Sequence, residues 1–178
     1  MPFTEPVTPA DVAMVVYLQS IERAIGDAYD KVLPLLGESS RPLATKLQAH
    51  HKDYVDALGA LAGPAAVGNA NQTLSLVLAF RLQNITDEKS ALTATAGIEN
   101  QLTETYALAF TTVTSPDVVK LLATVLPVIS SHAAALAALA ILPTASVFPN
   151  GPFEGTAVAG TDNTDVSLGF DPAAFPVG

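Results

Sequence analysis

The chain has 178 residues, of which 49% are hydrophobic and only 14% are charged, so it is long and apolar enough for one domain with a hydrophobic core. Its net charge of −9 argues against binding to nucleic acid or to anionic membrane surfaces, because both require basic patches. The absence of cysteine excludes disulfides, thiol catalysis and cysteine-ligated metal sites.

Start and stop signals predict two long helices in the first third of the chain. The first covers residues 9–36, with Thr8 as its N-cap, and Pro34 is expected to distort its last turn. The second covers residues 41–62 and ends at Gly63. The two helices are therefore joined by a short connection and are expected to form a hairpin.

The middle of the chain predicts a crossover followed by a second pair of long helices. Residues 63–71 read as a linker, and residues 72–82 form a short apolar element. A third long helix is predicted over residues 86–113 and a fourth over residues 116–142, with a kink near Pro127.

The fourth helix is apolar nearly all round. Residues 121–142 are long enough for a membrane span, but they carry Pro127 and His132 and lack flanking aromatic or basic anchors, so no membrane span is expected. In a soluble bundle such a helix must also be covered on its outer face, either by the C-terminal segment or by a second subunit.

The composition changes after residue 142. Residues 143–178 contain no Lys or Arg but several Pro, Gly and Phe residues, and they predict an extended segment that packs on the bundle or on a partner. Residues 156–170 could form a hairpin. The domain prediction is a helical bundle over residues 1–142, followed by this segment.

Two segments repeat one motif, a glutamate followed seven residues later by a tyrosine. Glu22 precedes Tyr29, and Glu99 precedes Tyr106. Apolar residues recur every three or four positions in phase with each glutamate, so both glutamates lie on the inward face of a helix. A buried carboxylate is costly unless it is paired.

His51 and His132 occupy comparable inward positions on the second and fourth long helices. The chain is therefore predicted to fold as two helical hairpins, each contributing one glutamate and one histidine to the interior. His50, which adjoins His51, points about 100° away around the helix and is expected to be exposed.

This pattern resembles the ferritin-like family, in particular rubrerythrin-type and secreted bacterial ferritin-like domains, over residues 9–142. The resemblance implies an all-α fold, a ferritin-like four-helix bundle with a long crossover between the second and third long helices. In that family one helix of each pair supplies a Glu, the other supplies a Glu-x-x-His motif, and together they hold two iron or manganese ions.

The resemblance carries over residue by residue. Glu22 and Glu99 match the lone glutamates, and His51 and His132 match the two histidines. The two remaining glutamates are replaced, one by Gln48 and the other by Ile129. These are the residues that bridge the metals in the family, and without them two adjacent cations would lack negative charge between them.

One divalent metal ion is therefore predicted at mid-bundle, where Fe, Mn, Zn and Cu all suit imidazole and carboxylate ligands. The predicted ligands are Glu22, His51, Glu99 and His132. The residues expected to surround these ligands are Gln48, Tyr29 and Tyr106. Any reaction would be a metal-dependent oxidation or reduction.

An alternative remains open, in which the two glutamates and two histidines pair with one another as a metal-free polar layer. The protein would then be a non-catalytic structural or interaction protein. It would assemble, as a homo-oligomer or with a protein partner, through the fourth helix and residues 143–178.

The first residues and the composition bear on the compartment. Residues 1–4 show no basic and apolar leader, so any leader is absent from this sequence. The content of Ala, Thr and acidic residues is similar to that of secreted bacterial proteins, which favours an extracytoplasmic location.

Overall fold

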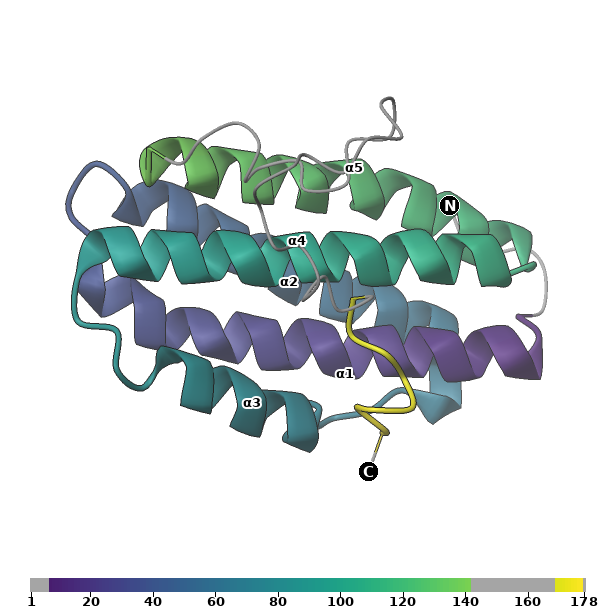
Figure 1. Ribbon diagram of the computed structural model, residues 1–178. Coiled ribbons are helices and arrows are strands. Elements are labelled where there is room, and N and C mark those ends of the chain that lie inside the picture. Colours follow the sequence, from purple (N-terminus) through teal and green to yellow (C-terminus); the bar gives the residue numbers. More distant parts are fainter. Residues whose placement is uncertain (1–6, 142–168, 178) are drawn as a thin grey trace, which may run out of the picture.

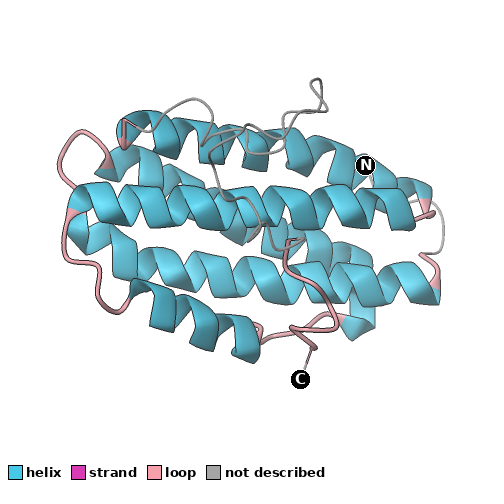
Figure 2. Cartoon of the chain, viewed as in Figure 1, coloured by secondary structure: helices cyan, strands magenta, loops and turns pink. Residues whose placement is uncertain are grey.

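The computed structural model describes residues 7–141 and 169–177, and all regular secondary structure in these two ranges is helical (Figure 2). The helices are α1 (Pro9–Val32), α2 (Arg41–Ala62), α3 (Gln72–Leu82), α4 (Glu88–Thr112) and α5 (Pro116–Leu139), with short 3-10 turns at Leu33–Leu35 and Gly63–Ala65. The predicted all-α bundle is confirmed.

Three of the five described α-helices, α1, α3 and α4, begin at a side chain that accepts a hydrogen bond from a free backbone N–H group. Thr8 accepts a bond of 3.1 Å from the N–H of Asp11 at the start of α1. Asn71 and Asp87 cap α3 and α4 in the same way. These contacts are local in sequence, which is why the starts could be predicted.

Two helices end before their predicted last residues, 36 and 142, while the expected distortion at Pro34 is present. The α-helical part of α1 ends at Val32, and Pro34 lies in the 3-10 turn that follows, because proline lacks the N–H that an α-helix needs. α5 continues through Pro127 as one helix and ends at Leu139. Soon afterwards Ile141 adopts a left-handed conformation, with φ of 56°.

The helices pack as two hairpins, α1 with α2 and α4 with α5. Between the hairpins α3 runs back along the outside of the bundle, so that α4 begins at the end of the molecule where α1 ends (Figure 1). As a result α1 and α4 lie side by side and run in opposite directions (Figure 1).

The core is a continuous layer of aliphatic side chains between the long helices. Fully buried members include Leu18, Ile25, Leu58, Leu102 and Leu122. α5 is long and apolar enough to cross a membrane by length and composition, but these properties are shared by core helices of soluble proteins. Within the bundle α5 packs against α4 and α2.

The end of the chain lies against the bundle near the middle of α1 and α4 (yellow in Figure 1). Phe170 is buried, its N–H donates to Thr105 Oγ1 at 2.7 Å, and its carbonyl accepts from the hydroxyl of Tyr17. The Asn71 amide donates to the carbonyl of Phe175 at 2.9 Å, which also ties this segment to the start of α3.

Gly169 allows the chain to turn so that Phe170 can pack against α1 and α4. Its φ is +51°, and a Cβ atom there would lie 2.7 Å from the backbone nitrogen of Thr105, so glycine is required on both counts. Most of the predicted hairpin over residues 156–170 lies outside the described residues. Residues 142–168 also lie outside the described residues, and they are part of the C-terminal segment that, as an alternative to a second subunit, was predicted to cover the fourth helix.

Candidate metal centre

The four inward polar residues predicted from the sequence come from four different helices. Glu22 lies on α1, His51 on α2, Glu99 on α4 and His132 on α5. The first three are 0% exposed and His132 is 3% exposed. The bundle therefore brings two carboxylates and two imidazoles into its apolar interior.

His51 joins the two carboxylates. Its Nδ1 lies 2.6 Å from Glu22 Oε2, and its Nε2 lies 2.9 Å from Glu99 Oε1. Carboxylate oxygens accept hydrogen bonds, so both ring nitrogens carry a proton in this arrangement and His51 is an imidazolium.

The charges of this group stabilise one another. Burial alone lowers the pKa of His51, but the carboxylates of Glu99 and Glu22 outweigh burial and raise that pKa to about 10. Burial alone raises the pKa of Glu99, but His51 and His132 outweigh it and hold that pKa at about 2. Without a metal, the positive charge at the centre of the bundle is the His51 imidazolium.

Two tyrosines hydrogen bond to the carboxylates in a crossed pattern. Tyr29 of α1 donates to Glu99 Oε1 of α4 at 2.6 Å, and Tyr106 of α4 donates to Glu22 Oε1 of α1 at 2.5 Å. Burial, followed by the adjacent carboxylates, raises the pKa of both tyrosines well above the usual value. Both hydroxyls therefore stay protonated and act as donors.

The crossed pattern follows from the repeated motif and the direction of the helices. In each helix the glutamate and the tyrosine are seven residues apart, or about 10.5 Å along the axis. When two such helices run antiparallel, each glutamate faces the tyrosine of the other helix. The repeat in the sequence is thus a signal for this pairing.

Two atoms of the group have no hydrogen-bond partner among the residues that the structure describes. They are Glu99 Oε2 and His132 Nδ1, both buried, and they face each other at 3.4 Å. Together with His51, these residues offer ligand atoms that all lie within 4.8 Å of one another. Polar atoms left unpaired in a protein interior are costly, and a bound ion is one of the few things that would satisfy both.

His50 does not lie where the sequence predicted. It is half-buried, and its Nδ1 lies 3.0 Å from Nε2 of His132, with the ring centroids 5.2 Å apart. Burial, His132 and Lys46 lower the pKa of His50. The exposure prediction was wrong because α5 packs against the side of α2 that His50 occupies, next to the inward face.

The family model described as "Ferritin-like domain" matches residues 11–141. The chain belongs to the ferritin-like family. Comparisons with curated proteins and with solved structures found no match. The family assignment therefore depends on the domain match, which spans all five helices.

Gln48 and Ile129 stand where the resemblance implied that this ferritin-like chain would have bridging glutamates, and neither is a carboxylate. The amide nitrogen of Gln48 donates to the carbonyl of Gly26 at 2.9 Å and to Asp30 Oδ1 at 2.7 Å, so it is held by α1. Ile129 is fully buried in the aliphatic core. Neither residue adds negative charge to the site.

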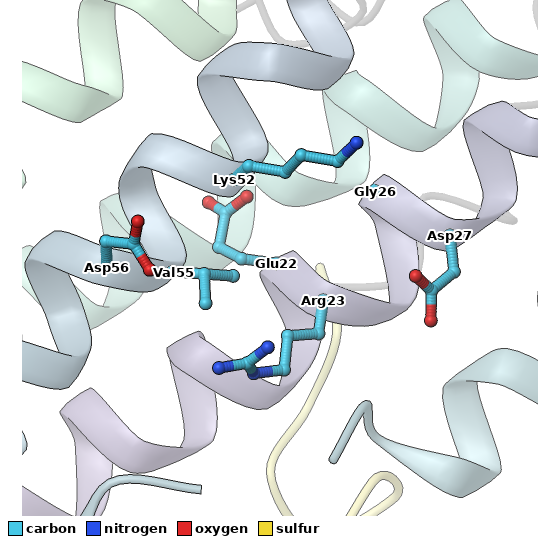
Figure 3. Close-up of a pocket in the computed structure, with 7 residues that line it drawn as sticks. All are labelled: Glu22, Arg23, Gly26, Asp27, Lys52, Val55 and Asp56. Atoms are coloured by element: carbon cyan, nitrogen blue, oxygen red, sulfur yellow. The ribbon is translucent and has the colours of Figure 1, made fainter. Parts of the chain in front are cut away.

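A surface pocket of the ferritin-like bundle opens between α1 and α2 on the outer side of Glu22. It is lined by Glu22, Arg23, Gly26, Asp27, Lys52, Val55 and Asp56. Figure 3 shows the Glu22 carboxylate directed toward α2, while Asp27 points away from it. The pocket brings charged, solvent-facing side chains close to the buried group without exposing Glu22 itself.

Proposed function

We propose that this ferritin-like protein binds one divalent transition-metal ion between α2, α4 and α5. The ligands would be His51 Nε2, the Glu99 carboxylate and His132 Nδ1. The observation that carries the proposal is that Glu99 Oε2 and His132 Nδ1, both buried, face each other at 3.4 Å without a hydrogen bond.

The spacing of this pair supports a common ion. Two ligand atoms at about 2.1 Å from one ion, at a tetrahedral angle, are about 3.4 Å apart, and zinc sites have ligand distances of this size. The separation of Glu99 Oε2 from His132 Nδ1 is 3.4 Å.

The donor set narrows the choice of metal. Two imidazoles and one carboxylate are found in mononuclear Zn sites and in non-haem Fe(II) sites, and three protein ligands leave further positions free for water or substrate. Such an ion would supply Lewis acidity, and in the case of iron or manganese also one-electron chemistry.

Glu22 was predicted from the sequence as a metal ligand, but in this proposal it does not bind the ion. Its carboxylate contacts Nδ1 of His51, on the side of the ring opposite to the proposed ligand atom Nε2. A histidine ligand commonly donates its second N–H to a carboxylate, which orients the ring and makes it more basic. Glu22 would orient His51, and Tyr106 would in turn hold Glu22.

Metal binding would replace the single positive charge of the His51 imidazolium by the two charges of the ion. The Nε2 proton of His51 must leave before this nitrogen can act as a ligand, so metal uptake is expected to release a proton. A single ion suits the charge of the site, since Glu22 and Glu99 are the only carboxylates among the residues shown to contact this group.

Elemental analysis tests the proposal directly. The protein is purified without chelators, equilibrated separately with Fe²⁺ under anaerobic conditions and with Mn²⁺, Zn²⁺ and Cu²⁺, and then desalted. We expect about one ion per chain for at least one metal, and below about a tenth of an ion for His132→Ala and Glu99→Gln. Asp53→Asn, an exposed substitution on α2, is the control. Wild-type protein that retains less than about a tenth of any of these metals would refute the proposal.

The contacts of His51 favour a second candidate function, in which the protein binds no metal and acts by assembly. An imidazolium between two carboxylates is a self-sufficient ion pair, and a buried polar layer of this kind can set the register of a bundle without any metal. In this case the protein would act by assembly through the end of α5, where Leu139 and Ile141 are exposed. Light scattering of wild-type protein and of Ile141→Asp tests this candidate, which requires an oligomer that dissociates in the variant.

A further inference from the structure

His50 contacts a proposed metal ligand, His132, although neither the family motif nor the donor set includes it. Its Nδ1 lies 3.0 Å from Nε2 of His132, which is the nitrogen that faces away from Glu99. The two ring planes are inclined by only 26° and their centroids are 5.2 Å apart, so the rings meet edge to edge through these two nitrogens. His50 is half-buried, so it lies between the buried group and the surface.

The tautomer of His132 decides whether this residue can bind a metal. A neutral imidazole carries a single N–H, and a ligand nitrogen must be unprotonated. His132 can therefore present Nδ1 to an ion beside Glu99 only when its proton is on Nε2. Since His132 is 3% exposed, that N–H needs a protein acceptor.

We propose that His50 is a positioning residue for the metal site: its Nδ1 accepts the hydrogen bond from His132 Nε2 and so holds His132 in the tautomer and orientation that turn Nδ1 toward Glu99. This inference rests on the proposed metal site. Each histidine ligand would then have an acceptor for the N–H of its second ring nitrogen, because Glu22 orients His51 and His50 orients His132.

The half-buried position of His50 fits this role. Its Nδ1 faces Nε2 of His132, and the small angle of 26° between the ring planes keeps the contact close to both planes, as an N–H···N hydrogen bond requires. No acceptor other than His50 contacts His132 Nε2 among the residues that the structure describes. Loss of the His50 acceptor would leave a buried N–H unpaired in the tautomer that binds metal.

The test is Zn²⁺ affinity, measured by competition with a chromophoric chelator. His50→Leu removes the acceptor at similar size, and we expect affinity to fall about 10- to 100-fold, as for other residues that orient metal ligands. His50→Asn places a carbonyl oxygen near the position of Nδ1 and should remain within about threefold of wild type. Ala49→Leu, on the exposed neighbouring position of α2, controls for an added leucine.

The visible spectrum of the Co²⁺-substituted protein gives a second measurement, independent of any activity. His50→Leu should alter the ligand-field bands, and His50→Asn should restore them. Thermal melting of the metal-free variants shows whether they are folded.

Three outcomes overturn the inference, and they are distinguishable. Wild-type affinity in His50→Leu means that His132 needs no acceptor, while the metal site itself stands. An equal loss of Zn²⁺ affinity in His50→Asn and His50→Leu means that the imidazole ring is needed for binding and its acceptor nitrogen is not. Failure of the wild-type protein to bind Zn²⁺ or Co²⁺ removes the proposed function and this inference together.

Discussion

Tyr106 of α4 donates a hydrogen bond of 2.5 Å to Glu22 Oε1 of α1, across the interface of two antiparallel helices (Figure 1). The equivalent bond in the opposite direction runs from Tyr29 to Glu99. These bonds tie the first hairpin to the second at the level of the buried charges, so they contribute to stability whether or not a metal is bound.

Removing either hydroxyl should therefore destabilise the bundle. Tyr106→Phe and Tyr29→Phe each leave a buried carboxylate oxygen with one donor fewer, which should lower the free energy of unfolding by about 1–3 kcal/mol. Urea denaturation measures the change. Tyr54→Phe is the control, because its hydroxyl has no hydrogen-bond partner among the described residues, and it should change stability by less than about 0.5 kcal/mol. Equal effects of all three substitutions would contradict the crossed pairing.

The charged group predicts how stability depends on pH in the metal-free protein. His51 has a pKa of about 10 in the folded chain, against 6.5 as its ordinary value. Its contribution is therefore complete below pH 6.5 and is lost as the pH rises toward 10. Urea midpoints measured in the presence of a chelator should fall across this range. His51→Gln lacks the titrating group and should show a flatter profile, so parallel profiles would argue against the ion pair.

Asp11 joins the start of α1 to the start of α5. Its carboxylate accepts hydrogen bonds from the backbone N–H groups of Thr114 and Ser115, the latter at 2.6 Å. Burial alone raises the pKa of Asp11, but these bonds and the Ser115 hydroxyl outweigh it and lower the pKa below 3.8.

Asp11→Asn should lower the free energy of unfolding at neutral pH by about 1.5–3 kcal/mol, because hydrogen bonds to a charged acceptor are lost. The contribution of Asp11 is present above pH 3.8 and disappears as the pH falls through the lowered pKa, so wild type and variant should converge in acid. Denaturation at pH 7 and pH 3 tests both statements, with exposed Asp53→Asn as the control. A difference that persists unchanged at low pH would exclude this explanation.

The end of the chain should contribute to the stability of the bundle. Phe170 is 2% exposed and packs edge-on against Phe175, so Phe170→Ala should cost about 3–5 kcal/mol. Phe80 on α3 is 73% exposed, and Phe80→Ala should cost less than about 0.5 kcal/mol. Thermal or urea unfolding compares the two variants, and similar losses would mean that Phe170 does not hold the segment in place.

Much of the fold could be predicted because its signals are local. Thr8 marks the start of α1 by a bond to a residue three positions away, and Gly63 ends α2. The inward faces follow from the spacing of apolar residues, and this spacing alone placed Glu22, His51, Glu99 and His132 in the interior. The match of residues 11–141 to the ferritin-like family agrees with this pattern.

The contacts between the helices were decided only by the tertiary structure. The sequence does not state that His51 contacts both carboxylates, that Glu99 Oε2 and His132 Nδ1 are left facing each other, or that His50 reaches His132. Each of these depends on how far one helix is rotated and shifted relative to the next. One residue turns a helix by about 100°, so a small rotation decides whether His50 meets water or α5. Periodicity determined which residues point inward, whereas the packing of α1, α2, α4 and α5 determined which atoms meet.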